Sequence, residues 1–289
     1  MYSRRQFGKI ALSAFPLAAA RAARFDSRIH GVQIGAQTYS FRDRLLDPCI
    51  EALVQVGLNE AELYMGHVEP LTATDDETRE LLRKWRIETP LDYFRGVSRK
   101  FSDAGITLSA YSLNFNDSFT DKELNRGFEI TKAMGLDLIT TSTTLTCARR
   151  LAPMAEKHRV RVAMHGHDNV TDPNQFAKPE SFAEALQMSK QFYINLDIGH
   201  FFAAGYDPVQ YIQQMHEKIL VLHIKDRKKD HGPGTPFGEG DTPIRDVLLL
   251  LRDKHYPIPA NIEYEYGAPG MDAVAEVKKC YQYCKAALA

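Results

Sequence analysis

The chain alternates regularly between short apolar, β-branched runs and longer segments with the periodicity of amphipathic helices. Strands separated by helices pair in parallel, and eight such units predict a closed (β/α)8 TIM barrel, an α/β fold formed as a single domain. An open doubly wound sheet is the alternative, but no G-x-G-x-x-G motif follows the first predicted strand. The predicted strands are residues 32–40, 58–65, 106–113, 136–142, 160–166, 192–200, 219–225 and 259–266.

The first residues resemble a bacterial twin-arginine export signal. The stretch "SRRQFGK" (residues 3–9) carries paired arginines, residues 10–20 are uncharged and rich in Ala, and an A-x-A-like cleavage site ends at Ala22. The apolar stretch is shorter than the roughly 20 residues that span a bilayer, so we expect no stable membrane insertion. The pattern predicts a signal peptide at residues 1–22, a barrel domain at 23–289, recognition by the twin-arginine translocation machinery, and a periplasmic or otherwise exported product.

The charge of the chain argues against a nucleic-acid partner. Cleavage after residue 22 removes Arg4, Arg5, Lys9 and Arg21 and no acidic residue, which changes the formal net charge from −1 to −5. A mildly acidic chain has no basic surface with which to neutralise phosphates. The four cysteines include no C-x-x-C pair, and we expect them to serve in packing. Composition leaves open whether the chain forms a homo-oligomer.

Ionisable side chains stand at the ends of four consecutive predicted strands. The C-terminal ends of barrel strands meet at one mouth, where TIM-barrel enzymes have their active sites. A single histidine there is usually a hydrogen-bonded structural residue, but four buried ionisable groups in succession are costly unless they are paired or bind a metal. His165, Asp197, His223 and Glu263 provide two nitrogen and two oxygen ligands, which suit a divalent metal ion. We expect Mn²⁺ or Zn²⁺.

Four motifs in the second half of the chain carry a family resemblance: "LDIGH", "HIKDR", "FGEGDTPI" and "IEYE". In this order and spacing the chain resembles the xylose isomerase-like barrel superfamily, which includes sugar phosphate isomerases and epimerases. In the ketose epimerases of that superfamily the metal is held by Glu, Asp, His and Glu at the ends of strands five to eight. Asp197, His223 and Glu263 match the last three of these ligands, whereas His165 stands where the epimerases have the first Glu.

The resemblance implies a metal-dependent isomerase or epimerase that acts on a small carbohydrate, a keto-sugar or polyol, through an enediolate-like intermediate. Because His165 replaces one of the two glutamates that transfer protons in the epimerases, the alternative is a metal-dependent lyase or hydratase that acts on a 3-keto-glycoside or inosose. Export favours an unphosphorylated substrate, because phosphorylated sugars are scarce outside the cytoplasm. An endonuclease IV-like phosphodiesterase is less favoured, because it needs more metal ligands and a basic face for DNA. A non-catalytic sugar-binding barrel is also less favoured, because it gives no reason for a complete four-ligand set.

Other polar residues near the strand ends are candidates for proton transfer and substrate binding. A general base needs a pKa near the working pH and reach to the substrate. Glu263, His167 and Glu62 are the predicted catalytic groups, with a buried salt bridge as the alternative role of Glu62. The predicted substrate-binding residues are Gln37, Tyr111, His200 and Lys225. For His200, orienting a metal ligand is the alternative role.

Overall fold

The computed structural model describes residues 25–267 and 270–289, so the predicted signal peptide lies outside the described residues. Eight parallel strands close into a barrel because the first, β2, also pairs with the last, β9. The barrel strands are β2 (Val32–Gln37), β3 (Glu60–Tyr64), β4 (Thr107–Ser112), β5 (Leu138–Ser142), β6 (Arg161–His165), β7 (Phe192–Asp197), β8 (Ile219–Ile224) and β9 (Ala260–Ile262). The predicted single TIM barrel is confirmed. A short strand, β1 (Arg28–Ile29), pairs antiparallel with β2.

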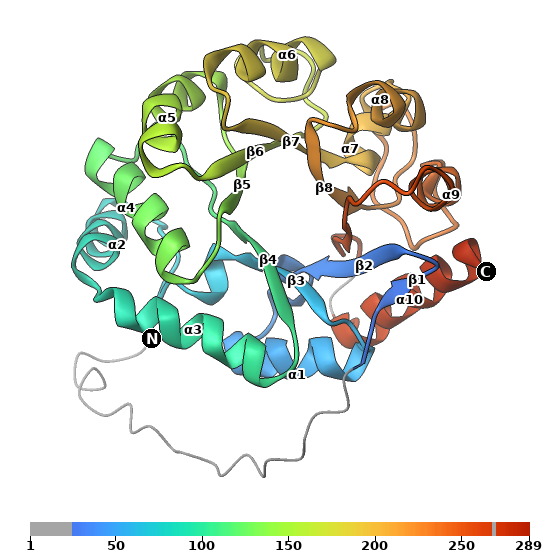
Figure 1. The fold of residues 1–289 in the computed structure, drawn as a ribbon, viewed down its shortest axis with the longest axis horizontal. Helices are drawn as coiled ribbons and strands as arrows, with labels where there is room; N and C mark the ends of the chain where they lie inside the picture. Colours follow the sequence, from blue (N-terminus) through green and yellow to red (C-terminus); the bar gives the residue numbers. More distant parts are fainter. Residues whose placement is uncertain (1–24, 268–269) are drawn as a thin grey trace.

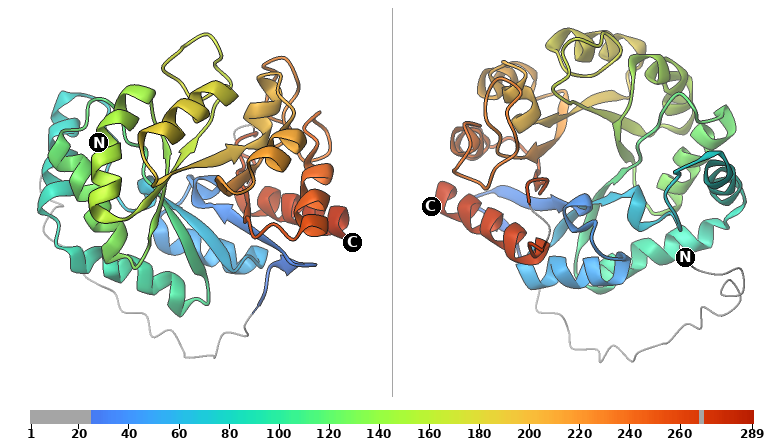
Figure 2. Two further views of the ribbon diagram at one scale, coloured as in Figure 1. Left: turned by 45° about the horizontal axis from the view of Figure 1, so that its top comes forward. Right: turned by 180° about the vertical axis from the view of Figure 1, so that it is seen from behind.

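Helices surround the barrel on the outside (Figures 1 and 2). They are α1 (Leu46–Val56), α2 (Asp76–Glu88), α3 (Leu91–Asp103), α4 (Asp121–Ala133), α5 (Leu145–His158), α6 (Pro179–Met188), α7 (Ile198–Ala203), α8 (Pro208–Met215), α9 (Ile244–Lys254) and α10 (Ala273–Leu288), with 3₁₀ turns η1 (Thr38–Phe41) and η2 (Met65–His67). The last helix, α10, packs beside α1 and α9 and completes the ring. No helix in the described ranges is long and apolar enough to cross a membrane.

Local sequence signals place the helix ends. Thr120 caps α4 and forms a reciprocal capping box with Glu123, while Asp207 caps α8, which begins at Pro208. Gly57 ends α1 in the left-handed conformation, with a φ of 93°, which costs a glycine little. These signals fix where each helix turns back toward the next strand.

The inside of the barrel changes from apolar to polar along its axis. Inward-facing Ala110, Leu138, Ala163 and Val221 form a small apolar cluster. Toward the C-terminal ends of the strands, the inward positions carry ionisable and amide side chains instead. The main apolar core lies between sheet and helices, and all four cysteines are buried and unpaired by disulfides, as expected. The polar interior is therefore the distinctive part of this barrel.

Candidate metal centre and active site

The four predicted metal ligands come together at the C-terminal mouth of the barrel. His165 and Asp197 are the last residues of β6 and β7, His223 is the penultimate residue of β8, and Glu263 directly follows β9. Each offers one ligand atom, and these atoms all lie within 4.8 Å of one another. All four side chains are almost completely buried. Successive strands of one closed sheet bring residues that are far apart in sequence to one point.

Two ligand atoms at this point lack hydrogen bonds. His165 Nε2 and Asp197 Oδ2 have no hydrogen bond that meets normal geometry in the part of the chain that the structure describes; they lie 3.5 Å apart, and Lys225 Nζ is 3.0 Å from Asp197 Oδ2. The other carboxylate oxygen of Asp197, Oδ1, accepts a hydrogen bond of 2.7 Å from the backbone N–H of His200, which orients the side chain. Buried polar atoms are normally satisfied, so an unpartnered imidazole nitrogen that faces a carboxylate oxygen fits a bound divalent cation. This group can hold such an ion.

A second layer of side chains orients the histidine ligands. Glu62 Oε2 lies 2.8 Å from His223 Nε2, and Glu62 Oε1 accepts a hydrogen bond from Thr140. The carboxylates of Glu62 and Glu263 stand at Nε2 and Nδ1 of His223 and raise the pKa of that imidazole well above its ordinary value; a metal held through Nδ1, which lies 3.1 Å from Glu263, would replace the proton there and leave Nε2–H donating to Glu62. The Ser142 hydroxyl lies 3.2 Å from Nδ1 of His165 and leaves Nε2 toward the ligand cluster. Such outer partners fix the tautomer and ring orientation of metal-binding histidines.

The ammonium group of Lys225 is surrounded by three carboxylates. Its Nζ is 3.0 Å from Asp197, 2.9 Å from Glu263 and 2.6 Å from Glu265. Burial opposes the charged form of Lys225, but the three carboxylates together raise its pKa above the ordinary value. Lys225 is 2% exposed, so it is a fixed positive charge behind the wall of the cavity.

A cavity of about 240 Å³ opens onto the ligand cluster. Predicted residues that line it are Gln37, His165, His167, His223 and Glu263. Neutral polar side chains that the sequence reasoning missed also line it: Ser112, Asn114, Thr141, Ser142 and Asn195. Tyr39, Tyr64 and Glu265 complete the lining, and no described lysine or arginine is part of it. The cavity is therefore polar, with few charges apart from the ligands.

His167 is the histidine of the cavity that stands outside the ligand set. Burial, together with the neighbouring His165 and His200, lowers the pKa of His167 to about 3. Its ring centroid lies 5.0 Å from that of His165 and 5.2 Å from that of His200. Its backbone N–H donates to Phe176, which fixes the loop after β6. His167 thus presents a neutral imidazole to the cavity.

Comparison with known proteins identifies the family. The family model described as "Xylose isomerase-like TIM barrel" matches residues 50–284. The chain belongs to this family. The L-ribulose-5-phosphate 3-epimerase UlaE of Shigella flexneri is 25% identical over 245 residues, covering 83% of this chain and 76% of the relative. The protein of the same name from Escherichia coli is 29% identical over 136 residues, or 47% of each chain.

Two solved structures share the fold of this chain. The IOLI protein, determined with a bound zinc atom, superposes with a TM-score of 0.63 at 15% identity, over 89% of this chain and 98% of that one. The probable 3-DHS dehydratase AsbF of Bacillus anthracis gives a TM-score of 0.63 at 17% identity, over 87% of this chain and 98% of that one. At these identities the likeness shows the fold alone.

Two predicted residues of this xylose isomerase-like barrel lie away from the cavity. Tyr111 does not line it and instead faces outward, beside Arg86 and Phe119, so its predicted role in substrate binding is corrected. The register of β4 shifts opposite Ala61 and Glu62, which turns Ser112 inward at the strand end in its place. Glu62 is fully buried beneath His223 and also does not line the cavity.

His200 and Lys225 lie behind the cavity wall rather than in its lining. His200 Nδ1 lies 2.5 Å from Arg227 Nη1 and 3.6 Å from Asp168. Its Nε2 is 3.0 Å from Lys225 Nζ. These contacts support the alternative role predicted for His200, in which it orients neighbouring groups. They also occupy the ammonium group of Lys225, which was predicted to bind a substrate oxygen.

Proposed function

We propose that this protein is a metal-dependent isomerase or epimerase of an unphosphorylated keto-sugar or polyol. The observation that carries the proposal is the convergence of His165, Asp197, His223 and Glu263 in the barrel mouth, where all but Asp197 line a polar cavity. Catalytic sites of TIM barrels lie at this end of the strands. The epimerase names of the UlaE relatives and the zinc atom of the IOLI structure support the same reading.

The two histidines and two carboxylates would hold one divalent ion, with Zn²⁺ or Mn²⁺ as our choice for this ligand set. When bound, the ion supplies Lewis-acid polarisation of neighbouring carbonyl and hydroxyl oxygens of the sugar. The chain itself supplies the orientation of the ligands. Glu62 and Ser142 hold the imidazoles of His223 and His165 in position.

Proton transfer is assigned to Glu263 and His167, since both line the cavity. A pKa of about 3 makes His167 a weak base in the empty cavity, so the proposed proton transfer requires that the bound substrate raise that pKa toward the working pH. Gln37, Ser112 and Asn114 offer amide and hydroxyl groups for the remaining sugar hydroxyls. Glu62 is not assigned a direct proton transfer, because its carboxylate oxygens already contact His223 and Thr140.

The absence of lysine and arginine from the described lining supports an unphosphorylated substrate. Phosphate groups are usually bound by Arg, Lys or a helix N-terminus that presents backbone N–H groups. Neutral amides, hydroxyls and two tyrosine rings suit the hydroxyls and apolar faces of a free sugar. The substrate therefore differs from that named for the UlaE relatives in carrying no phosphate.

A lyase or dehydratase is the second candidate. His165 occupies the position at which the epimerase pattern has a glutamate, so one of the two carboxylate proton carriers of that pattern is replaced. An elimination next to a carbonyl needs one base and one acid at the leaving group; in this alternative His167 would take the proton next to the carbonyl and return that same proton to the leaving group, with Glu263 beside it. The structural likeness to AsbF, named a probable dehydratase, is compatible with this alternative.

We also propose that the mature enzyme is exported through the twin-arginine machinery, as residues 1–22 predict. Replacing both Arg4 and Arg5 by Lys should keep the full-length protein inside the cytoplasm in a fractionation experiment. Equal export of this variant and the parent chain would contradict the proposed route.

The function is tested with a panel of free ketoses, inososes and 3-keto-glycosides, together with ketose phosphates, in deuterated water. The protein is loaded with Zn²⁺ or Mn²⁺, and His223→Ala and metal-stripped protein serve as controls. Deuterium incorporation with an isomerised free sugar supports the isomerase, and release of an aglycone or water supports the lyase. Turnover of the phosphates alone, or equal turnover by His223→Ala, would contradict the proposal.

A further inference from the structure

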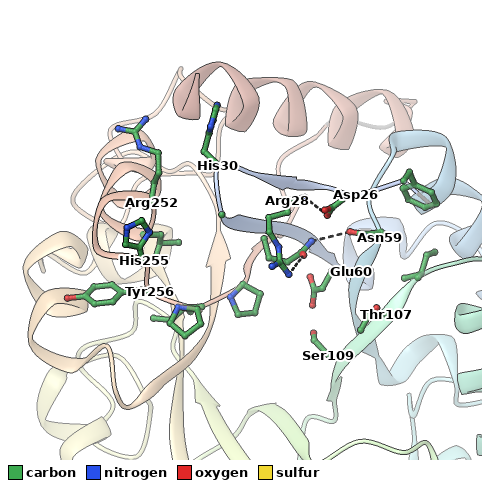
Figure 3. Close-up of a pocket in the computed structure, with 18 of the residues that line it drawn as sticks. Asp26, Arg28, His30, Asn59, Glu60, Thr107, Ser109, Arg252, His255 and Tyr256 are labelled. Atoms are coloured by element: carbon green, nitrogen blue, oxygen red, sulfur yellow. Dashed lines mark hydrogen bonds between the residues drawn. The ribbon is translucent and has the colours of Figure 1, made fainter. Parts of the chain in front are cut away.

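A second cavity, of about 980 Å³, lies at the opposite end of the barrel, where the strands begin (Figure 3). Its lining includes the first residues of β3 and β4, Glu60 and Thr107, and Pro259 just before β9. Part of the turn between β1 and β2 and the residues after α9 form its outer wall. This end of a TIM barrel usually serves stability, so a deep cavity here needs its own explanation.

Glu60 forms the deep end of this cavity. Its side chain is 5% exposed, and neither carboxylate oxygen has a hydrogen-bond partner among the described residues. Gly35 makes room for it, because a Cβ at that position would lie 1.5 Å from Glu60 Oε2. Burial, assisted by the nearby carboxylate of Glu62, raises the pKa of Glu60 to about 8. Glu60 is therefore mostly protonated at neutral pH, and its ionised form, which prevails above about pH 8, would be stabilised by a group that brings positive charge and hydrogen-bond donors.

Asn261 adds a third unpartnered acceptor beside Glu60. Its Nδ2 donates to Glu62 Oε2 at 3.4 Å, which turns its Oδ1 toward Glu60 and leaves that oxygen without a partner in the described structure. The Oδ1 atom lies 2.5 Å from the same Cβ point on Gly35, so it is at most 4.0 Å from Glu60 Oε2. Two carboxylate oxygens and one amide oxygen therefore meet at the deep end of the cavity, and the neighbouring hydroxyl of Ser109 is directed to the Ala61 carbonyl at 3.3 Å.

We propose that this cavity binds a small molecule with a primary ammonium group, which pairs with Glu60. An –NH₃⁺ group has three N–H donors, which match the three unpartnered acceptors in number, and its charge complements the carboxylate. The apolar side chains of Ile106 and Ile258 offer a surface for the carbon stem of the ligand. One carboxylate is too few oxygen ligands for Ca²⁺, and an anion would face Glu60 directly.

The outer part of the cavity would contact the end of the ligand opposite its ammonium group. Arg28 and Arg252 line it near the surface, and the guanidinium of Arg28 donates only to Gln33, at 3.4 Å, among its side-chain contacts with described residues. A simple amine and an amino acid with a carboxylate at its far end share the ammonium group that the deep site recognises. The two are distinguished by whether a carboxylate strengthens binding and whether Arg28→Gln removes that gain.

The experiment uses the metal-loaded wild-type protein at pH 8.5, where Glu60 is largely ionised. Crystals are soaked with 4-bromobenzylamine, and the anomalous signal of bromine locates the ligand, with 4-bromobenzyl alcohol as the uncharged control. Binding constants for the two compounds and for ε-aminocaproate are measured by calorimetry on wild type, Glu60→Gln and the exposed control Glu51→Gln. We expect Glu60→Gln to weaken amine binding roughly ten- to hundredfold, as for loss of a charged hydrogen-bond partner.

Binding of the amine beside Glu60, with loss in Glu60→Gln but not in Glu51→Gln, supports the proposal. Bromine elsewhere, equal binding of the alcohol, or equal stabilisation by sodium ions would overturn it. Circular dichroism checks that Glu60→Gln is folded. If that variant does not fold, the comparison of amine with alcohol on the wild-type protein decides the question. None of these readouts depends on the active site at the other end of the barrel.

Discussion

Replacing Glu62 by Gln separates a positioning role from a catalytic one. Glu62 lies entirely inside the barrel, bonded to His223 and Thr140, and does not line the cavity. Glutamine keeps the size of the side chain and can still accept a hydrogen bond from His223 Nε2, but it lacks the negative charge. If Glu62 orients His223, the variant should bind metal more weakly and yet retain its chemistry once metal is bound.

The size of the effect follows from the hydrogen bond between His223 and Glu62. A hydrogen bond to a charged partner is worth roughly 1.5–3 kcal/mol and one between neutral groups about 1 kcal/mol, so the exchange costs about 1–2 kcal/mol. Losing the carboxylate also makes the imidazole less basic as a ligand. Together these changes predict a loss of about 10- to 100-fold in metal affinity, the range usual for such outer partners.

Metal affinity is measured by competition between the stripped protein and a chromophoric chelator for Zn²⁺, and turnover is then measured at saturating metal. Glu51→Gln, an exposed exchange of the same kind on α1, is the control. We expect Glu62→Gln to recover turnover to within about fivefold of wild type once metal is saturating. Unchanged metal affinity with a loss of turnover of more than about 100-fold would refute this reasoning and assign Glu62 to proton transfer.

Three further substitutions test other parts of the structure. Burial raises the pKa of Glu60 from 4.5 to about 8, so its contribution to stability is present below pH 4.5 and lost as the pH rises through 8. In amine-free urea unfolding, Glu60→Gln should therefore remove a decline of roughly 3.5 kcal/mol in the free energy of unfolding between pH 5 and pH 8. Parallel pH profiles of the variant and the wild type would contradict this. His167→Asn should keep metal binding but lower turnover by about 100-fold or more, so near-normal turnover would exclude it as a proton carrier. Tyr111→Phe should leave kcat/KM within about twofold, because the ring faces away from the cavity, and a tenfold loss would place the hydroxyl at the substrate.

The sequence was sufficient to predict the barrel and the convergence of the ligands, for physical reasons. Each barrel strand is a short apolar run followed by a helical pattern, and parallel pairing puts the ends of such runs on one rim. His165, Asp197, His223 and Glu263 lie within one residue of those ends, so strand length errors of one or two residues did not separate them. Closure of the sheet, through β2 and β9, then brings the rim residues to a common point.

What the sequence did not predict is the direction and depth of individual side chains. A register shift in β4 changes which residues face inward, so Tyr111 points outward and Ser112 points into the cavity. Alternation of side chains predicts an inward direction for Glu62 and Lys225 but not whether other side chains cover them. The neutral lining residues, such as Asn195, carried no signal beyond the same alternation, because amides and hydroxyls are common at strand ends.

The charges at the barrel mouth favour a divalent ion over a monovalent one. Asp197, Glu263, Glu265 and Glu62 bring four carboxylates into a small, largely buried volume, and Lys225 is the one ammonium among them. When both imidazoles ligate a metal they are neutral, which leaves three negative charges among these groups; a divalent ion reduces the remainder to one, whereas a monovalent ion leaves two. Because uncompensated buried charge is costly, the balance favours the divalent ion. Lys225 lies against the same carboxylates, so it lowers their mutual repulsion while remaining protonated and unable to act as the base.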